Sequence, residues 1–296
     1  MKQLVFIHGR SQAGKDAVTL KATWIDAWKK GLAKSGLELP IPEERIRFPY
    51  YGDTLQQMVD GASAEEAAKI IVRGAQDDTA AQAFLSAMLQ EYIDAANISD
   101  EEIEQELDPA DAAVIERGPQ NWRWVQAVLR AIDKHTDGGS AMIALLTNDV
   151  HQYLSKANLR AHIEDGVLQA MDLARENVVV AHSLGTVVGY TLLRRLEKEG
   201  QAWRVPLLVT LGSPLGIRAL RGKLRPIGHP ASVTAWFNAY DPNDVVSLNP
   251  LDKDNFAITP AIENKGDVDN WTDNQHGIIG YLDDKVVAKR IYDALV

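Results

Sequence analysis

Residues 177–185 constrain the fold more than any other stretch, because an apolar run there leads directly into a serine between small residues. The three consecutive valines at 178–180 favour a strand that is covered on both faces in a parallel sheet. From residue 184 to residue 196 apolar side chains recur at helical spacing, and Gly200 marks the end of that helix. The sequence therefore predicts that Ser183 lies on a tight turn between a buried strand and a helix.

The residues around Ser183 fit such a turn. Ala181 and Gly185 lie two positions before and two positions after it, where a larger side chain would collide with the neighbouring backbone. N–H groups at the start of the helix are expected to point toward the serine and to stabilise a developing negative charge. The segment 181–185 resembles the G-x-S-x-G nucleophile elbow of the α/β-hydrolase superfamily, with alanine in place of the first glycine. The alternative interpretation is a Rossmann-like strand and helix whose serine only caps the helix.

The rest of the chain predicts an α/β fold with a mainly parallel central sheet and helices on both faces. Further strands are expected at 4–10, 45–52, 205–211 and 233–240, and helices at 15–33, 151–175 and 282–295. Between the early strands and the serine, apolar stripes at helical spacing include Phe84, Met88 and Tyr92. The resemblance implies an α/β-hydrolase core of residues 1–53 and 148–296, with residues 54–147 as an acidic helical insertion that forms a lid or cap.

The same resemblance implies a Ser-His-Asp triad, because the superfamily has its nucleophile, acid and histidine in the chain order found here. Asp244 follows the expected strand at 233–240, and His276 lies in a polar loop before the closing helix. Asp241, which is closer to the end of the strand and begins a turn, is the alternative acid. Three further carboxylates are weaker candidates: Asp267, Asp269 and Asp273.

Other groups near these strands have expected roles. The resemblance implies that the backbone N–H groups of Arg10 and Leu184 form an oxyanion hole. Ser213 is a poor second nucleophile, because the proline that follows it has no N–H to donate. His229 lies between two prolines, in a segment that we predict to be a surface loop.

One segment supports a competing hypothesis. Residues Gly9 to Asp16 fit the phosphate-binding pattern G-x-x-x-x-G-K-[ST] at every place except the last, and they follow a strand. In a P-loop the final hydroxyl binds Mg²⁺ beside the phosphates, whereas Asp16 would bring a negative charge there. A P-loop-type nucleotide-binding protein is therefore kept as an alternative to the hydrolase.

Composition excludes several classes of protein. The net charge is −10, and residues 54–117 contain 15 Asp or Glu but 3 Lys or Arg, so nucleic acid is not an expected partner. The absence of cysteine excludes a disulfide framework, a thiol nucleophile and a Cys-based metal site. The apolar run after Met1 is too short for a membrane span and has no small-residue cleavage site, so we expect a cytoplasmic protein without stable membrane insertion.

These observations predict a serine hydrolase that cleaves a carboxylic ester through an acyl-enzyme. Its substrate is expected to be a small-molecule or lipid-like ester, and its mechanism needs no metal or organic cofactor. The fold hosts many reactions, so a hydrolase-fold module that binds ligands without turnover is a second alternative. The sequence does not specify the acyl chain length or the oligomeric state.

Overall fold

The fold is an α/β structure built on one parallel sheet. The computed structural model describes residues 1–9, 16–50, 79–107, 122–136, 139–272 and 274–296. In these residues, six strands pair in the order β2-β1-β3-β4-β5-β6, and every pair is parallel. The strands are β1 (Lys2–Ile7), β2 (Ile46–Arg47), β3 (Glu176–His182), β4 (Val205–Leu211), β5 (Val233–Ala239) and β6 (Glu263–Lys265). The predicted α/β class and parallel sheet are confirmed.

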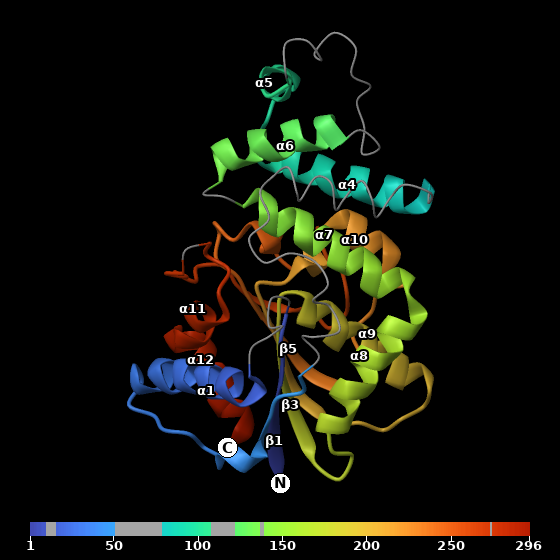
Figure 1. Ribbon diagram of the computed structural model, residues 1–296. Coiled ribbons are helices and arrows are strands. Elements are labelled where there is room, and N and C mark those ends of the chain that lie inside the picture. The colour runs from blue at the N-terminus through green and yellow to red at the C-terminus, as the bar shows by residue number, and fades with distance from the viewer. Residues whose placement is uncertain (10–15, 51–78, 108–121, 137–138, 273) are drawn as a thin grey trace.

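Helices cover both faces of the sheet, and the alternation of side chains along the strands explains why (Figure 1). Leu4 and Phe6 of β1 belong to one apolar core, whereas Val5 and Ile7 belong to the other. The first core is completed by α1 (Ala17–Ala33), α11 (Ile278–Asp283) and α12 (Lys285–Leu295). The second is completed mainly by α7 (Ser140–Ser155), α8 (Ala157–Ala170) and α9 (Leu184–Lys198). Buried strands of this kind need apolar residues on both faces, which is why the valine run is continuous.

A further group of helices lies beyond the carboxyl ends of the strands (Figure 1). It consists of α4 (Thr79–Ala95), α5 (Asp100–Gln105) and α6 (Trp122–His135), and it adjoins α10 (Arg218–Lys223) of the core. The apolar stripe predicted on α4 is confirmed, since Phe84, Met88 and Tyr92 are all buried. Glu91 of α4 accepts hydrogen bonds from the first two backbone N–H groups of α10, at 2.9 and 2.7 Å. This contact fixes α4 to the core at a helix N-terminus, where a carboxylate is favourable.

Two predicted helices are wrong in their extent. The helix expected at 151–175 is two helices, α7 and α8, because Lys156 has an extended backbone with φ −98° and ψ 95°. The expected boundary at 147/148 therefore falls inside α7, and the boundary at 53/54 lies outside the described residues. The closing helix is also divided, into α11 and α12, at Asp284. Short 3₁₀ helices are η1 (Glu43–Arg45), η2 (Pro214–Gly216) and η3 (Val245–Ser247).

Among the described residues, no helix combines sufficient length with sufficient apolar character to cross a bilayer.

Candidate active site

Ser183 lies at the junction of β3 and α9, as the sequence predicts. Its backbone has φ 55° and ψ −131°, a region that a residue with a side chain rarely adopts and that costs about 1–3 kcal/mol. The surrounding structure holds it there, since the Ser183 N–H donates to the carbonyl of Leu211 at 3.0 Å. Only 4% of the residue is exposed. A strained serine between a strand and a helix is the geometry that presents a hydroxyl above the edge of a sheet.

The start of α9 packs directly against β1, and this contact requires a glycine. A Cβ on Gly185 would lie 2.4 Å from the carbonyl oxygen of Ile7 and 2.6 Å from that of His8. Both distances are far below van der Waals contact with backbone atoms that cannot easily move. The small residue predicted two positions after Ser183 is therefore needed for strand and helix to pack this closely.

A buried acid–base pair lies next to this turn. Nδ1 of His276 is 2.8 Å from Oδ2 of Asp244, and a carboxylate only accepts, so Nδ1 carries the hydrogen. In the neutral ring this leaves the lone pair on Nε2. That atom is buried and has no hydrogen-bond partner in the described part of the chain. It is therefore free to accept a proton.

Asp244 is held by several donors at once. Besides His276, its Oδ2 accepts from the hydroxyl of Tyr281 at 2.6 Å, and its Oδ1 accepts from the N–H of Val246 at 2.9 Å. Burial alone would raise the pKa of Asp244, but the charge of His276 and these hydrogen bonds together lower it below its usual value. The carboxylate is therefore ionised at neutral pH and can stabilise a positive charge on His276.

His276 is fixed beside the nucleophile turn by His182, the residue before Ser183. The Nε2 of His182 lies 2.8 Å from the backbone carbonyl oxygen of His276, and the two rings are 4.7 Å apart. Burial, and to a smaller extent the neighbouring His276, lowers the pKa of His182 to about 3. The neutral ring therefore donates through Nε2, because a carbonyl only accepts. No hydrogen bond joins Ser183 to His276 in the described residues, and such bonds are often long before a substrate binds.

Asp241, the alternative acid, has other partners. The two carboxylate oxygens of Asp241 accept from the backbone N–H groups of Asn243 and Asn270, both at 2.7 Å. These bonds tie together the loops that carry Asp244 and His276. Asp241 makes no hydrogen bond to His276 in the described residues, so its position is that of a structural turn residue.

The other described candidates have hydrogen-bond or ion-pair partners outside the pair. His229 contacts the carbonyl of Pro230 and the ring of Trp236. The hydroxyl of Ser213 accepts from Leu215 N–H and bonds to Thr186, so it caps η2. Of the weaker acids, Asp267 pairs with Lys265 on the surface, and Asp273 lies outside the described residues.

One of the two predicted oxyanion donors can be located. Leu184 is the first residue of α9, and N–H groups in a first helical turn have no acceptor within the helix. The other predicted donor, Arg10, lies outside the described residues. Gly9 is described, and a Cβ placed on it would lie 2.6 Å from the Cβ of Ser183. The loop after β1 therefore begins in direct contact with the serine.

Only the two ends of the segment that supports the P-loop hypothesis are described. Most of the segment from Gly9 to Asp16 lies outside the described residues. Asp16 itself caps α1, since its carboxylate accepts from the N–H and the hydroxyl of Thr19, each at 2.8 Å. Its carboxylate thus has the role of a helix N-cap.

Two residues at the site were not predicted from the sequence. Tyr281 belongs to α11, where its ring packs in the apolar core and only its hydroxyl reaches Asp244. The pattern of that helix gives no signal for this role. His182 lies within the elbow segment itself, and a polar residue next to the serine was a signal that could have indicated it.

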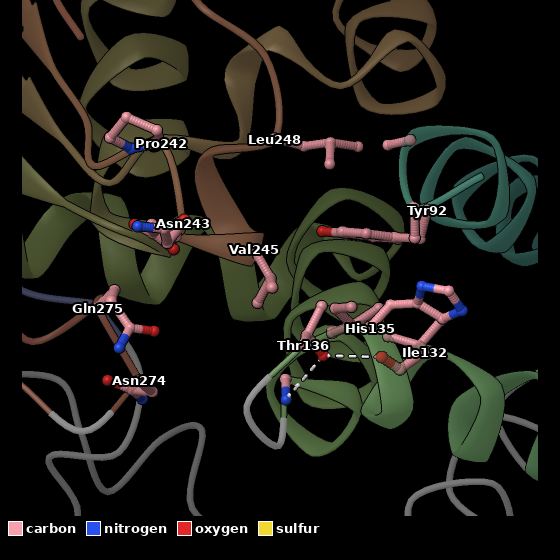
Figure 2. A pocket seen from close by; sticks show the side chains of 15 residues that line it. Tyr92, Ile132, His135, Thr136, Pro242, Asn243, Val245, Leu248, Asn274 and Gln275 are labelled. Carbon is pink, nitrogen blue, oxygen red and sulfur yellow. Dashed lines mark hydrogen bonds between the residues drawn. The ribbon is translucent and has the colours of Figure 1, made fainter. Parts of the chain in front are cut away.

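The described residues contain no group of three or more His, Cys, Asp or Glu side chains placed to hold a metal ion. A cavity of about 480 Å³ adjoins Asp244 but is not lined by Ser183 (Figure 2). Comparison of the sequence with models of known protein families and with curated proteins found no match. A function is therefore inferred from the geometry of the site.

Proposed function

We propose that the protein is a serine hydrolase of the α/β-hydrolase type that cleaves a carboxylic ester, with Ser183, His276 and Asp244 as its triad. One observation carries the proposal: the residue before a serine in a strained strand-to-helix turn, His182, hydrogen-bonds to a buried histidine, His276, whose free nitrogen is set by an aspartate. A helix-capping serine would not require that strain, nor a buried carboxylate–imidazole pair beside it.

The reaction follows from the roles of these atoms. Nε2 of His276 takes the hydroxyl proton of Ser183 as Oγ attacks the ester carbonyl carbon. The negative charge that forms on the carbonyl oxygen is stabilised by the N–H of Leu184 and, through the resemblance, by that of Arg10. His276 then gives its proton to the leaving alkoxide, which departs as the alcohol and leaves an acyl-serine. Water, deprotonated by the same nitrogen, releases the acid and restores the serine.

The helices beyond the carboxyl edge of the sheet support a lid or cap in this proposal. They cover the edge at which Ser183 and Asp244 lie (Figure 1), and α4 is anchored to α10 through Glu91. The apolar faces of α4 and α6 pack within the same core as α9. Substitutions on the faces of these helices would then change the ranking of esters more than the reactivity of the serine.

A fluorophosphonate probe tests the proposal, because it labels an activated serine and not a helix cap. We expect the wild-type protein to be labelled and the Ser183→Ala variant to lose both labelling and ester hydrolysis. Ser213→Ala is the matched control, since that serine is equally buried but caps η2. Undiminished labelling of Ser183→Ala would refute the assignment of the nucleophile. An unlabelled wild-type protein would favour the binding module or the nucleotide-binding protein.

A further inference from the structure

A cavity of about 480 Å³ lies between the helices beyond the sheet and the loops that carry Asp244 and His276 (Figure 2). One wall comes from α4, α6 and the start of α7, and it includes Tyr92, Ile132 and Thr136. The other wall comes from residues 242–248 and 274–275. Its volume is within the range of pockets that hold small molecules.

Tyr92 supplies a polar group without a partner at this cavity. The residue is 3% exposed, and its hydroxyl forms no hydrogen bond in the part of the chain that the structure describes. Figure 2 shows the hydroxyl pointing away from α4 toward Val245 on the opposite wall. Burial and the charge of Asp244 raise the pKa of Tyr92, so it remains a protonated donor. An unpaired buried donor is costly, and an oxygen atom of a ligand would satisfy it.

The remaining lining groups define the chemistry of that ligand. The described side chains around the cavity include neutral polar groups: Thr136, Asn243, Asn274 and Gln275. They include no Lys or Arg, and the histidine among them, His135, already lies 3.0 Å from the carboxylate of Glu102, whereas the ionised Asp244 lies at the wall. A phosphate or carboxylate on the ligand would therefore be repelled without compensation. Apolar side chains such as Ile132, Ile143 and Leu248 also line the cavity. The lining therefore suits an uncharged group that carries oxygen atoms on a carbon skeleton better than an anion.

The position of the cavity indicates which part of an ester enters it. Asn274 and Gln275 directly precede His276, and Asp244 contributes to the wall, but Ser183 and Leu184 do not. His276 itself does not line the cavity, but Asp244, which accepts from its Nδ1, does. The cavity thus lies beside the residues that position the base, and not beside the group that binds the oxyanion.

We infer that this cavity binds the alcohol part of the ester, and that this part is an uncharged polyol whose oxygen accepts a hydrogen bond from Tyr92. The inference rests on the proposed function, because it concerns the substrate of the same triad. It predicts a preference among esters that share one acyl group and differ only in the alcohol.

The test compares three butyrate esters: glyceryl monobutyrate, propyl butyrate and the butyrate of glycerol phosphate. For the wild-type protein, kcat/KM should be highest for the glyceryl ester and lowest for the phosphate ester. Tyr92→Phe should lower the ratio of glyceryl to propyl ester by about 3- to 10-fold, the range expected for one hydrogen bond. Ala96→Leu, which fills the cavity from the residue that follows α4, should lower the same ratio without removing a polar group.

Controls separate this inference from the proposed function. Tyr190→Phe removes a hydroxyl that bonds to the backbone of Gly228, outside the cavity lining, and it should leave the ratio unchanged. A wild-type protein that is labelled by fluorophosphonate but prefers propyl butyrate or the phosphate ester would overturn the inference alone. Equal losses for the glyceryl and propyl esters in Tyr92→Phe would also overturn it. A wild-type protein that is not labelled would overturn the proposed function, and the inference with it.

Discussion

Asp241 and Asp244 lie three residues apart on the loop after β5, and replacement by asparagine should lower stability at the first and kcat at the second. Asp244 accepts from His276, Tyr281 and the N–H of Val246. In Asp244→Asn the single amide oxygen cannot serve all three donors, and the histidine is no longer held with its hydrogen on Nδ1. Loss of the correct tautomer costs about 10⁴ in kcat where it has been measured in such triads, so we expect a loss of that order.

Asp241→Asn should act on stability instead. The carboxylate accepts two backbone N–H groups at 2.7 Å, one from Asn243 and one from Asn270. An amide keeps one acceptor and turns its own NH₂ toward the second N–H, which is then buried without a partner. The loss of one charge-assisted bond lowers the free energy of unfolding by about 2–3 kcal/mol. Because Asp241 does not touch His276, the folded variant should keep most of its kcat.

The two effects are measured separately. Hydrolysis of a short ester gives kcat for each variant at a temperature where circular dichroism shows it to be folded, and denaturant titration gives the free energy of unfolding. The assignment of Asp244 as the acid is refuted if folded Asp241→Asn loses kcat as severely as Asp244→Asn. It is also refuted if Asp244→Asn retains wild-type turnover, since the pairing with His276 would then have no catalytic role.

Three further predictions follow from single contacts. Gly185→Ala should lower the free energy of unfolding by about 3 kcal/mol, because the new Cβ would meet two carbonyl oxygens of β1 and the loop that follows it. The control Gly166→Ala, in open space on α8, should instead raise the free energy of unfolding by up to about 1 kcal/mol. Equal effects of the two substitutions in denaturant titrations would contradict this prediction. Tyr281→Phe removes a 2.6 Å donor from Asp244 and should lower kcat about tenfold, with unchanged kcat as the contrary result. The pKa of His182 is about 3 in the folded protein and 6.5 in the unfolded chain, so its contribution to stability is full above pH 6.5 and is lost toward pH 3 at about 1.4 kcal/mol per pH unit. His182→Gln should therefore reduce the pH dependence of the free energy of unfolding by that slope. An unaltered slope would show that another group titrates.

The sequence predicted the central strands well because burial on both faces of the sheet requires a run of apolar residues. Strands β3, β4 and β5 are covered on both faces and therefore appear as apolar runs of the expected length. The turn at Ser183 was predictable for a related reason, since close packing of strand and helix restricts positions 181 and 185 to small residues. The strand β6 has no such pattern, because it has three residues at the edge of the sheet and two of them are exposed.

The break between α7 and α8 could not be predicted, because no glycine or proline marks it. It is set by tertiary contacts: the hydroxyl of Tyr153 on α7 bonds to Glu164 on α8 at 2.8 Å, and Glu164 pairs with Arg195 of α9. In a continuous helix, 11 residues span about 16 Å, so Tyr153 and Glu164 could not meet. The fold-back at Lys156 makes this contact possible, and nothing local encodes it.

The site depends on the order of the strands as much as on the identity of its residues. Ser183 follows β3 and Asp244 follows β5, so the end of β4 lies between them. Gly212 occupies that end with φ 54°, and a Cβ on it would lie 2.9 Å from Oδ2 of Asp244 and 3.0 Å from Nδ1 of His276. A residue with a side chain would therefore hold the acid–base pair away from the middle strand. In this fold the glycine after β4 gives Asp244 and His276 room to reach across one strand toward the serine.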